Sequence, residues 1–241
     1  MKKALLSIIF IYGMSLSLFA EESKVLTLNK ISSANDLNIF LKYYYTNPNL
    51  ELVPKAMKYI RDQKLNENKD LERHFVPFFA EIFRTNDEQI PIWFKNLTPL
   101  SNDDIYNFAH SMYLAGGKNG KIEIQNFLKS TNNEELKQVL TKLSSNTNPI
   151  DLKTVPLTDA VFLDMLWSSF FATGDVDFLD KLILATETNK NSINEVLIFS
   201  AARWSVKANA KEHKKIYDYC VSKNGKYSDD INAFLLEISG E

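Results

Sequence analysis

Apolar side chains recur at the spacing of an α-helix along nearly the whole chain, and this pattern constrains the fold more than any other feature. Nowhere do β-branched and aromatic residues alternate with polar ones over the length of a strand. Glycine, which weakens helices, is scarce, because the 241 residues include only seven. The sequence therefore predicts an all-α protein. The expected helices span residues 34–46, 52–64, 70–85, 90–97, 102–115, 120–130, 133–144, 156–173, 176–188, 193–210, 212–223 and 228–238.

Residues that favour helix starts occur where these segments begin. Ser101 and Ser192 each precede an acidic residue by three positions, which is the spacing of a capping box. Asp175 and Ser228 also stand at expected cap positions, where a side-chain oxygen can accept a hydrogen bond from a free backbone N–H group. Pro77 instead falls inside the segment 70–85, so we expect a kink at its middle or two short helices there.

Two helices stand out by their apolar content. The segment 156–173 has apolar residues on more than one face, which predicts a helix sandwiched between neighbours. The segment 193–210 has a narrower apolar stripe with small residues in it, which permits close helix packing. We expect these two helices to form the best-packed part of the fold. The stripe consists of Ile193, Leu197, Ala201, Trp204 and Ala208.

Three turns share one arrangement of apolar residues. Around Gly174 an aromatic residue, Phe170, lies four positions before the turn, and apolar residues lie five and nine positions after it. The same offsets recur around Pro48 and, with one exception, around Gly117. This spacing, and above all the run from Phe170 to Asp175, resembles the helical hairpins of tetratricopeptide-like (TPR-like) repeats. The resemblance implies an array of antiparallel helix hairpins, forming either a TPR-like superhelix or a compact right-handed α-α stack.

The chain departs from that family five positions after each turn, where the family favours a small residue and this sequence has Leu179, Val53 and Ile122. The stretches 163–175 and 201–205 also resemble uncharacterised exported bacterial proteins. That second resemblance implies no particular activity.

The first twenty residues have the pattern of a secretory signal peptide. Lys2 and Lys3 precede an apolar run, and Leu18-Phe19-Ala20 offers a cleavage site before two acidic residues. We therefore predict cleavage after residue 20 and a periplasmic or secreted protein, with an uncleaved anchor as the alternative. Residues 21–241 are expected to form a single all-helical domain, with a subdivision near 145–156 as the alternative.

Charge and hydropathy exclude two classes of partner. Without Lys2 and Lys3 the chain has 26 basic and 30 acidic side chains, a net charge of −4, and no basic stripe for phosphate groups. The longest later stretch without Asp, Glu, Lys or Arg runs from Ile105 to Gly117, and its 13 residues are fewer than the roughly 20 that a spanning helix needs. We therefore predict no nucleic-acid binding and no membrane span after signal cleavage.

The sequence contains no motif for metal binding or catalysis. The three histidines, His74, His110 and His213, are too far apart to provide paired zinc ligands. A single cysteine, Cys220, allows no internal disulfide. The glycine-rich loop 116–120 lacks the spacing of a phosphate-binding loop. We predict no metal ion, no cofactor and no catalytic residue.

A cell-wall-directed hydrolase is an alternative function. Glu81 lies among apolar residues on a predicted helix, where burial would raise its pKa and suit it to general acid catalysis. The acidic pairs 103–104 and 229–230 occur at expected helix starts, where they offset the helix dipole. A secreted effector or toxin-neutralising protein is a further alternative.

Aromatic side chains supply the candidates for a binding site. Tyr43, Tyr44 and Tyr45 surround one helix end, and the repeat offsets assign Tyr44 to the core, which leaves the other two rings for a partner. We predict an exported helical-repeat module that binds a protein or peptide partner in the cell envelope and catalyses no reaction. Its predicted partner-binding residues are Tyr43, Tyr45, Trp93 and Trp204.

Overall fold

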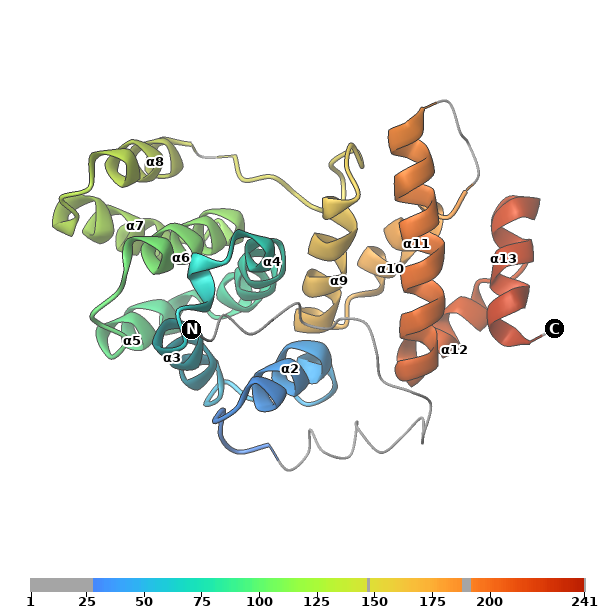
Figure 1. Cartoon of the computed structure of the whole chain (residues 1–241), viewed down its shortest axis with the longest axis horizontal. Helices are drawn as coiled ribbons and strands as arrows, with labels where there is room; N and C mark the ends of the chain where they lie inside the picture. Colours follow the sequence, from blue (N-terminus) through green and yellow to red (C-terminus); the bar gives the residue numbers. More distant parts are fainter. Residues whose placement is uncertain (1–27, 147, 188–191, 241) are drawn as a thin grey trace, which may run out of the picture.

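A computed structural model describes residues 28–146, 148–187 and 192–240, and every regular element in those ranges is a helix (Figure 1). The prediction of an all-α fold is thereby confirmed. The predicted signal peptide, residues 1–20, lies outside the described residues. The elements are α2 (Ala34–Tyr43), η1 (Tyr44–Thr46), α3 (Val53–Asp62), η2 (Leu65–Glu67), α4 (Lys69–Thr85), η3 (Asp87–Gln89), α5 (Ile90–Lys95), α6 (Asn102–Ala115), α7 (Lys118–Ser130), α8 (Glu134–Ser145), α9 (Val161–Thr173), α10 (Val176–Leu184), α11 (Ile193–Glu212), α12 (Lys214–Ser222) and α13 (Asp229–Ser239).

Helix α4 lies at the centre of the molecule, with α6 on one side and α9 on the other (Figure 1). Its two adjacent phenylalanines explain this position. Phe78 contacts Phe40 of α2 with ring centroids 5.6 Å apart, and Phe79 contacts Phe108 of α6 at 5.9 Å. Because adjacent residues point to different sides of a helix, α4 is apolar on more than one face and is covered on each.

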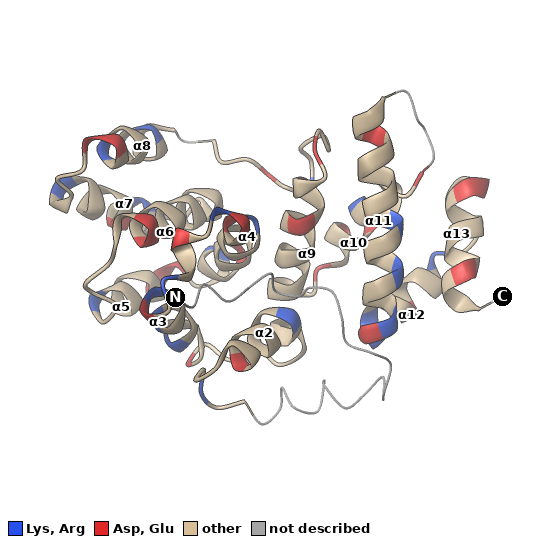
Figure 2. Ribbon diagram, in the orientation of Figure 1, with Lys and Arg blue, Asp and Glu red and all other residues tan. Residues whose placement is uncertain are grey.

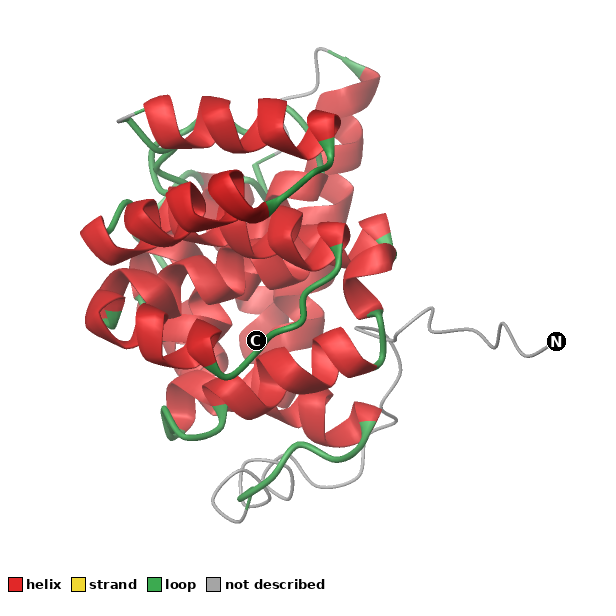
Figure 3. Ribbon diagram, turned by 90° about the vertical axis from the view of Figure 1, so that its left-hand side faces the viewer, coloured by secondary structure: helices red, strands yellow, loops and turns green. Residues whose placement is uncertain are grey.

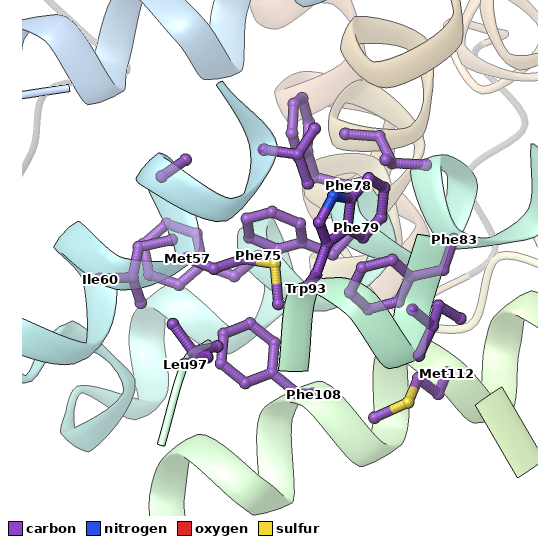
Figure 4. Packing of buried hydrophobic residues seen from close by; sticks show 14 of the residues in the cluster. Met57, Ile60, Phe75, Phe78, Phe79, Phe83, Trp93, Leu97, Phe108 and Met112 are labelled. Atoms are coloured by element: carbon purple, nitrogen blue, oxygen red, sulfur yellow. The ribbon is translucent and has the colours of Figure 1, made fainter. Parts of the chain in front are cut away.

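Aromatic rings from α4, α5 and α6 form the interior of the first half of the protein. Phe94 packs edge to face with Phe83 at 6.0 Å and with Phe108 at 5.3 Å. Figure 4 shows Phe83 and Phe108 together with Trp93 and the neighbouring apolar side chains. Edge-to-face pairs add to the stability that area burial provides, by roughly 0.5–1.5 kcal/mol each.

The buried apolar side chains form two large clusters. The first runs from α2 to α8, and the second runs from Leu152 to α13. Side chains from each half pack into the cluster of the other, because Ala172 of α9 belongs to the first cluster and Tyr45 of η1 packs against the second. Seen from the side of α5, α7 and α8, the helices are stacked one above another (Figure 3). Helix α9 and Tyr45 therefore join the two halves of the chain.

Three of the predicted helix caps are confirmed. The Ser101 side chain accepts a hydrogen bond from the backbone N–H of Asp104 at 3.1 Å, and the Asp104 carboxylate accepts one from the backbone N–H of Ser101 at 2.9 Å. Ser192 and Asp175 also accept bonds from the first turns of α11 and α10. Ser228 precedes α13, but its side chain makes no capping bond to the described residues.

Helix α4 is continuous through Pro77, so the alternative of two short helices is wrong. Proline has no N–H group, and the carbonyl of Arg73, one turn earlier, receives no hydrogen bond from it. The surrounding residues Val76, Phe78 and Phe79 are all buried. Their burial on several sides offsets the loss of one backbone hydrogen bond.

Helix α9 begins at Val161, five residues after the predicted start. Ala160 is the N-cap residue, and the Asp159 carboxylate accepts a hydrogen bond from the Val161 N–H at 2.8 Å, which satisfies the first free N–H group of the helix. The segment before it lies outside the helix and is attached to α10, because the Lys181 ammonium donates to the Leu152 carbonyl at 2.7 Å and also to the Val155 carbonyl.

Helix α11 buries a different face from the predicted one. Ile193, Leu197 and Trp204, three members of the predicted stripe, are 83%, 56% and 51% exposed. Small residues on the buried face explain the choice, because they let the helix approach its neighbours more closely than the Trp204 ring would. The residues that α11 buries are Ile198, Ala202, Val206 and Ala210.

Backbone N–H groups of the glycine-rich loop 116–120 bind the carboxylate of Asp87, which comes from another part of the same chain. Gly116 ends α6 in the left-handed conformation, with φ of 73°, whereas Gly117, the expected turn residue, is the N-cap of α7. The Asp87 carboxylate accepts hydrogen bonds from the backbone N–H groups of Asn119 and Gly120 at 2.9 and 3.0 Å. A Cβ on Gly117 would lie 2.0 Å from an Asp87 oxygen, so only glycine fits beside this cap.

We expect Phe79→Ala to lower the free energy of unfolding by about 3–5 kcal/mol, because it removes a fully buried ring between α4 and α6 and leaves a cavity. Chemical denaturation measures the change. The matched variant Ile92→Ala truncates an exposed side chain on α5 and should change stability little. A loss for Phe79→Ala no larger than that of the matched variant would contradict this account of the core.

Candidate functional site

The three consecutive tyrosines point in different directions. Tyr44 packs against Phe40 and Phe78 in the first cluster, with ring centroids 5.2 and 5.7 Å away. Tyr43 is only 1% exposed and its ring lies 4.6 Å from that of His213. A ring buried to this extent offers no surface to a partner, so Tyr43 leaves the set of partner-binding candidates.

Tyr45 lies where the two halves of the chain meet. Its ring centroid is 5.0 Å from that of Phe170 and 6.4 Å from that of Phe171, both on α9. Its hydroxyl lies 3.1 Å from Nδ1 of His213, between α11 and α12. The Tyr45 ring is half-buried. Its contacts with Phe170, Phe171 and His213 fix its position.

His213 is completely buried in this junction. Burial, and secondarily the nearby charge of Lys42, lowers the pKa of its imidazole to about 3. Lys42 itself forms an ion pair with Glu212 at 2.8 Å. Nε2 of His213 has no hydrogen-bond partner among the described residues. A charged imidazole would need acceptors at both nitrogens, so this site holds the neutral ring.

An open pocket of about 580 Å³ lies beside Tyr45, and we call it the junction pocket. Residues of η1, the start of α10 and one face of α12 line it. Its volume is in the range of small-molecule sites, roughly 300–1,000 Å³, but the pocket is open rather than enclosed. The residues that line it are Tyr45, Thr46, Val176, Lys214, Lys215, Asp218, Tyr219 and Ser222.

Two lysines at the start of α12 give the junction pocket its charge. Lys214 donates to the Asp218 carboxylate at 2.7 Å. Lys215 donates to the backbone carbonyl of Gly174 at 2.7 Å, and its ammonium lies 5.7 Å from the centroid of the Tyr45 ring. Gly174 ends α9 with φ of 67°, and a Cβ there would lie 2.8 Å from the Lys215 ammonium. A side chain at position 174 would therefore disturb the wall of the pocket.

A second apolar surface runs along α11. We define the α11 stripe as Ile193, Leu197 and Trp204, the exposed residues described above. Most charged residues of α11 lie toward its C-terminal end (Figure 2). The stripe therefore exposes apolar side chains on a helix face that no other described part of the chain covers.

Trp93, another of the predicted partner-binding residues, belongs neither to the junction pocket nor to the α11 stripe. Its ring is mostly buried against Phe83, with centroids 6.0 Å apart, and its edge lines a smaller pocket of about 280 Å³ between α3 and α5. The four residues predicted to bind a partner are therefore separated. Tyr45 lines the junction pocket, Trp204 belongs to the α11 stripe, Trp93 lines the smaller pocket and Tyr43 is interior.

Glu81, the candidate acid of the alternative function, is buried on α4. Burial raises the pKa of its carboxyl, and the Arg84 guanidinium, 3.3 Å away, opposes that rise. Glu81 lines neither the junction pocket nor the smaller pocket beside Trp93. Asp104, from one of the acidic pairs, acts in the capping box of α6.

The described ranges contain no group of three or more His, Cys, Asp or Glu side chains placed to hold a metal ion. Burial raises the pKa of the Cys220 thiol to about 12, so the sulfur stays protonated and unreactive at neutral pH. Within the same ranges, no helix has both the length and the apolar character needed to cross a bilayer.

Comparison with known protein families, with curated proteins and with solved structures finds no match for this chain.

Sequence reasoning identified Tyr45 but not its surroundings. His213 and Lys215 follow Tyr45 by 168 and 170 positions, and no motif connects them. The spacing around Gly174 did indicate that Phe170 packs into the turn. It gave no sign that the side chains of Tyr45 and Lys215 both lie against that turn.

His213 predicts a pH dependence of stability. In the folded protein its pKa is about 3, whereas in the unfolded chain it takes up a proton near 6.5. The unfolded state therefore binds more protons between these values, and the contribution of His213 to the free energy of unfolding should fall as the pH falls, by at most about 1.4 kcal/mol per pH unit. Burial, aided by the Arg73 charge, lowers the pKa of His74 to about 4, which acts in the same direction.

Urea denaturation between pH 7 and pH 4 measures this slope. We expect His213→Gln to reduce it without abolishing it, because His74 remains. Tyr217→Phe, which changes an exposed ring on α12, should leave it unaltered. Equal slopes for the unsubstituted protein and His213→Gln would show that the buried imidazole is not responsible.

Proposed function

We propose that this protein is an exported, non-catalytic helical-repeat module that binds a protein partner through the α11 stripe. The exposure of Ile193, Leu197 and Trp204 carries the proposal. Contiguous apolar side chains on a surface indicate contact with another molecule, because water solvates them poorly. Tryptophan in particular contributes strongly to protein interfaces.

The geometry of the stripe supports a protein rather than a small molecule as the partner. Its residues follow one face of α11 over about 17 Å, at 1.5 Å per residue. Ion pairs to α13 fix side chains of α11 nearby, because Arg203 binds Asp230 at 2.9 Å and Lys207 binds Glu237 at 3.0 Å. An apolar centre with polar residues at its rim is typical of protein interfaces.

The TPR-like arrangement and export belong to the same proposal. Helices that follow each other in the chain, such as α6 with α7 and α9 with α10, pack together. Left-handed glycines, Gly116 and Gly174, stand between the members of both pairs. Export rests on the pattern of residues 1–20, and it places the partner in the cell envelope.

Photo-crosslinking in cells tests the proposal. A photoreactive amino acid replaces Trp204 in the full chain, and the envelope fraction is analysed by mass spectrometry. We expect adducts with one reproducible protein, and we expect the N-terminus of the recovered chain to be Glu21. The matched control carries the same amino acid at Lys129, an exposed position on α7, and should give no such adduct.

A substitution at a second position tests the surface itself. Leu197→Ser should reduce the adduct yield at position 204 several-fold while leaving the melting temperature nearly unchanged, since the side chain is exposed. Adducts formed only between copies of this chain, or equal adducts at positions 204 and 129, would refute binding of a separate partner through the α11 stripe.

A further inference from the structure

We propose that the junction pocket holds an extended segment of a protein partner, whose acidic side chain pairs with Lys215 and whose adjacent apolar side chain packs on Tyr45 and Val176. The inference rests on the proposed function, because it takes the ligand to be a protein. It concerns a different surface from the α11 stripe and can fail independently.

Lys215 has no ion-pair partner among the described residues, and its charge acts on the Asp175 carboxylate only from a distance. Its ammonium donates to the carbonyl of Gly174, a neutral group, at 2.7 Å. Within the described ranges, no carboxylate lies within 4 Å of it, whereas Lys214 pairs with Asp218 and Lys42 pairs with Glu212. An ammonium has three N–H donors, so a carboxylate entering from the pocket can pair with Lys215 without displacing the bond to Gly174.

The other charged groups around Lys215 already have partners. Asp175, across the turn from Lys215, is bound by the Lys153 ammonium. Asp180, on the next turn of α10, accepts hydrogen bonds from Tyr227 and Lys223. The group that remains for a ligand of opposite charge is therefore Lys215, and this favours an acidic segment over a basic one.

Tyr45 and Val176 provide an apolar surface next to that charge. Phe170 packs against the Tyr45 ring, and the Tyr45 hydroxyl is hydrogen-bonded to Nδ1 of His213. Val176, at the first position of α10, is half-buried and faces the same pocket. Because these groups are already fixed, binding an apolar side chain here orders little of the protein.

The shape of the pocket favours an extended segment that passes along α12. Lys214, Lys215, Asp218, Tyr219 and Ser222 recur at helical spacing and line one wall. Over the nine residues of α12 this wall extends about 13 Å. A wall of this length accommodates consecutive residues of a peptide, and because the pocket is open, the peptide chain can continue beyond it. We therefore assign the carboxylate to an internal Asp or Glu.

Selection from a displayed library of short random peptides tests the assignment with the purified protein. We expect the enriched sequences to contain Asp or Glu next to a large apolar residue. The most enriched peptide, made with acetylated and amidated ends, should bind about tenfold more tightly than the same peptide with Asn or Gln at the acidic position, as fluorescence anisotropy measures.

Variants of the protein provide the matched comparison. Lys215→Met removes the charge but keeps an unbranched apolar side chain, and should weaken binding of the acidic peptide about tenfold, whereas Lys121→Met, at an exposed position on α7, should not. Lys215→Glu should restore binding when Lys replaces the acidic residue of the peptide. This exchange of charges separates pairing from a loss of folding.

Enrichment of sequences without an acidic residue, absence of any enrichment, or equal binding by Lys215→Met and the unsubstituted protein would overturn the inference. If Trp204 still crosslinks a partner in that case, the proposed function stands and only the role of the junction pocket falls. If peptide binding holds but no partner crosslinks at Trp204, the junction pocket stands and the α11 stripe is not the contact surface.

Discussion

The burial of α4 on opposite sides is the constraint on which the rest of the structure depends. Phe78 and Phe79 are adjacent in sequence, so they point to different sides of the helix, and neither is exposed to water. One ring requires α2 as a neighbour, and the other requires α6. Helix α9 also packs along α4. The second half of the chain is thereby attached to the interior of the first.

The candidate site is a consequence of that attachment. Once α9 lies on α4, its C-terminal turn at Gly174 comes beside η1, and Tyr45 packs on Phe170. The start of α12 meets the same place, because His213 contacts both Tyr43 and Tyr45. The junction pocket lies between η1, the start of α10, which follows that turn, and α12. Its walls therefore come from both halves of the chain.

The sequence was sufficient to locate the helices, because each must bury an apolar face at helical spacing. The predicted bounds of α6, 102–115, agree with the structure at both ends. The choice between two apolar faces of α11 could not be made in this way. Leu197 and Ile198 lie on two different faces of α11, and both faces contain apolar residues. Only packing against neighbouring helices decides which face is buried.

The site was harder to predict than the fold for a related reason. Aromatic residues at a helix end indicated Tyr45, which does line a pocket, and equally indicated Tyr43, which does not. The two residues are two positions apart, so their side chains point in different directions, and that of Tyr43 points to the interior. Lys215 has no signal in the sequence, because its role arises from a carbonyl 41 positions earlier in the chain.

Native-state hydrogen exchange tests the central position of α4 most directly. The amides of Phe79, Ile82 and Phe83 should exchange only when the whole protein unfolds, so their exchange free energy should equal that of global unfolding. The amides of α13, at the edge of the second cluster, should exchange at lower free energy. Exchange of the α4 amides at a free energy below that of α13 would contradict the account, because the helix would then open without the rest of the protein.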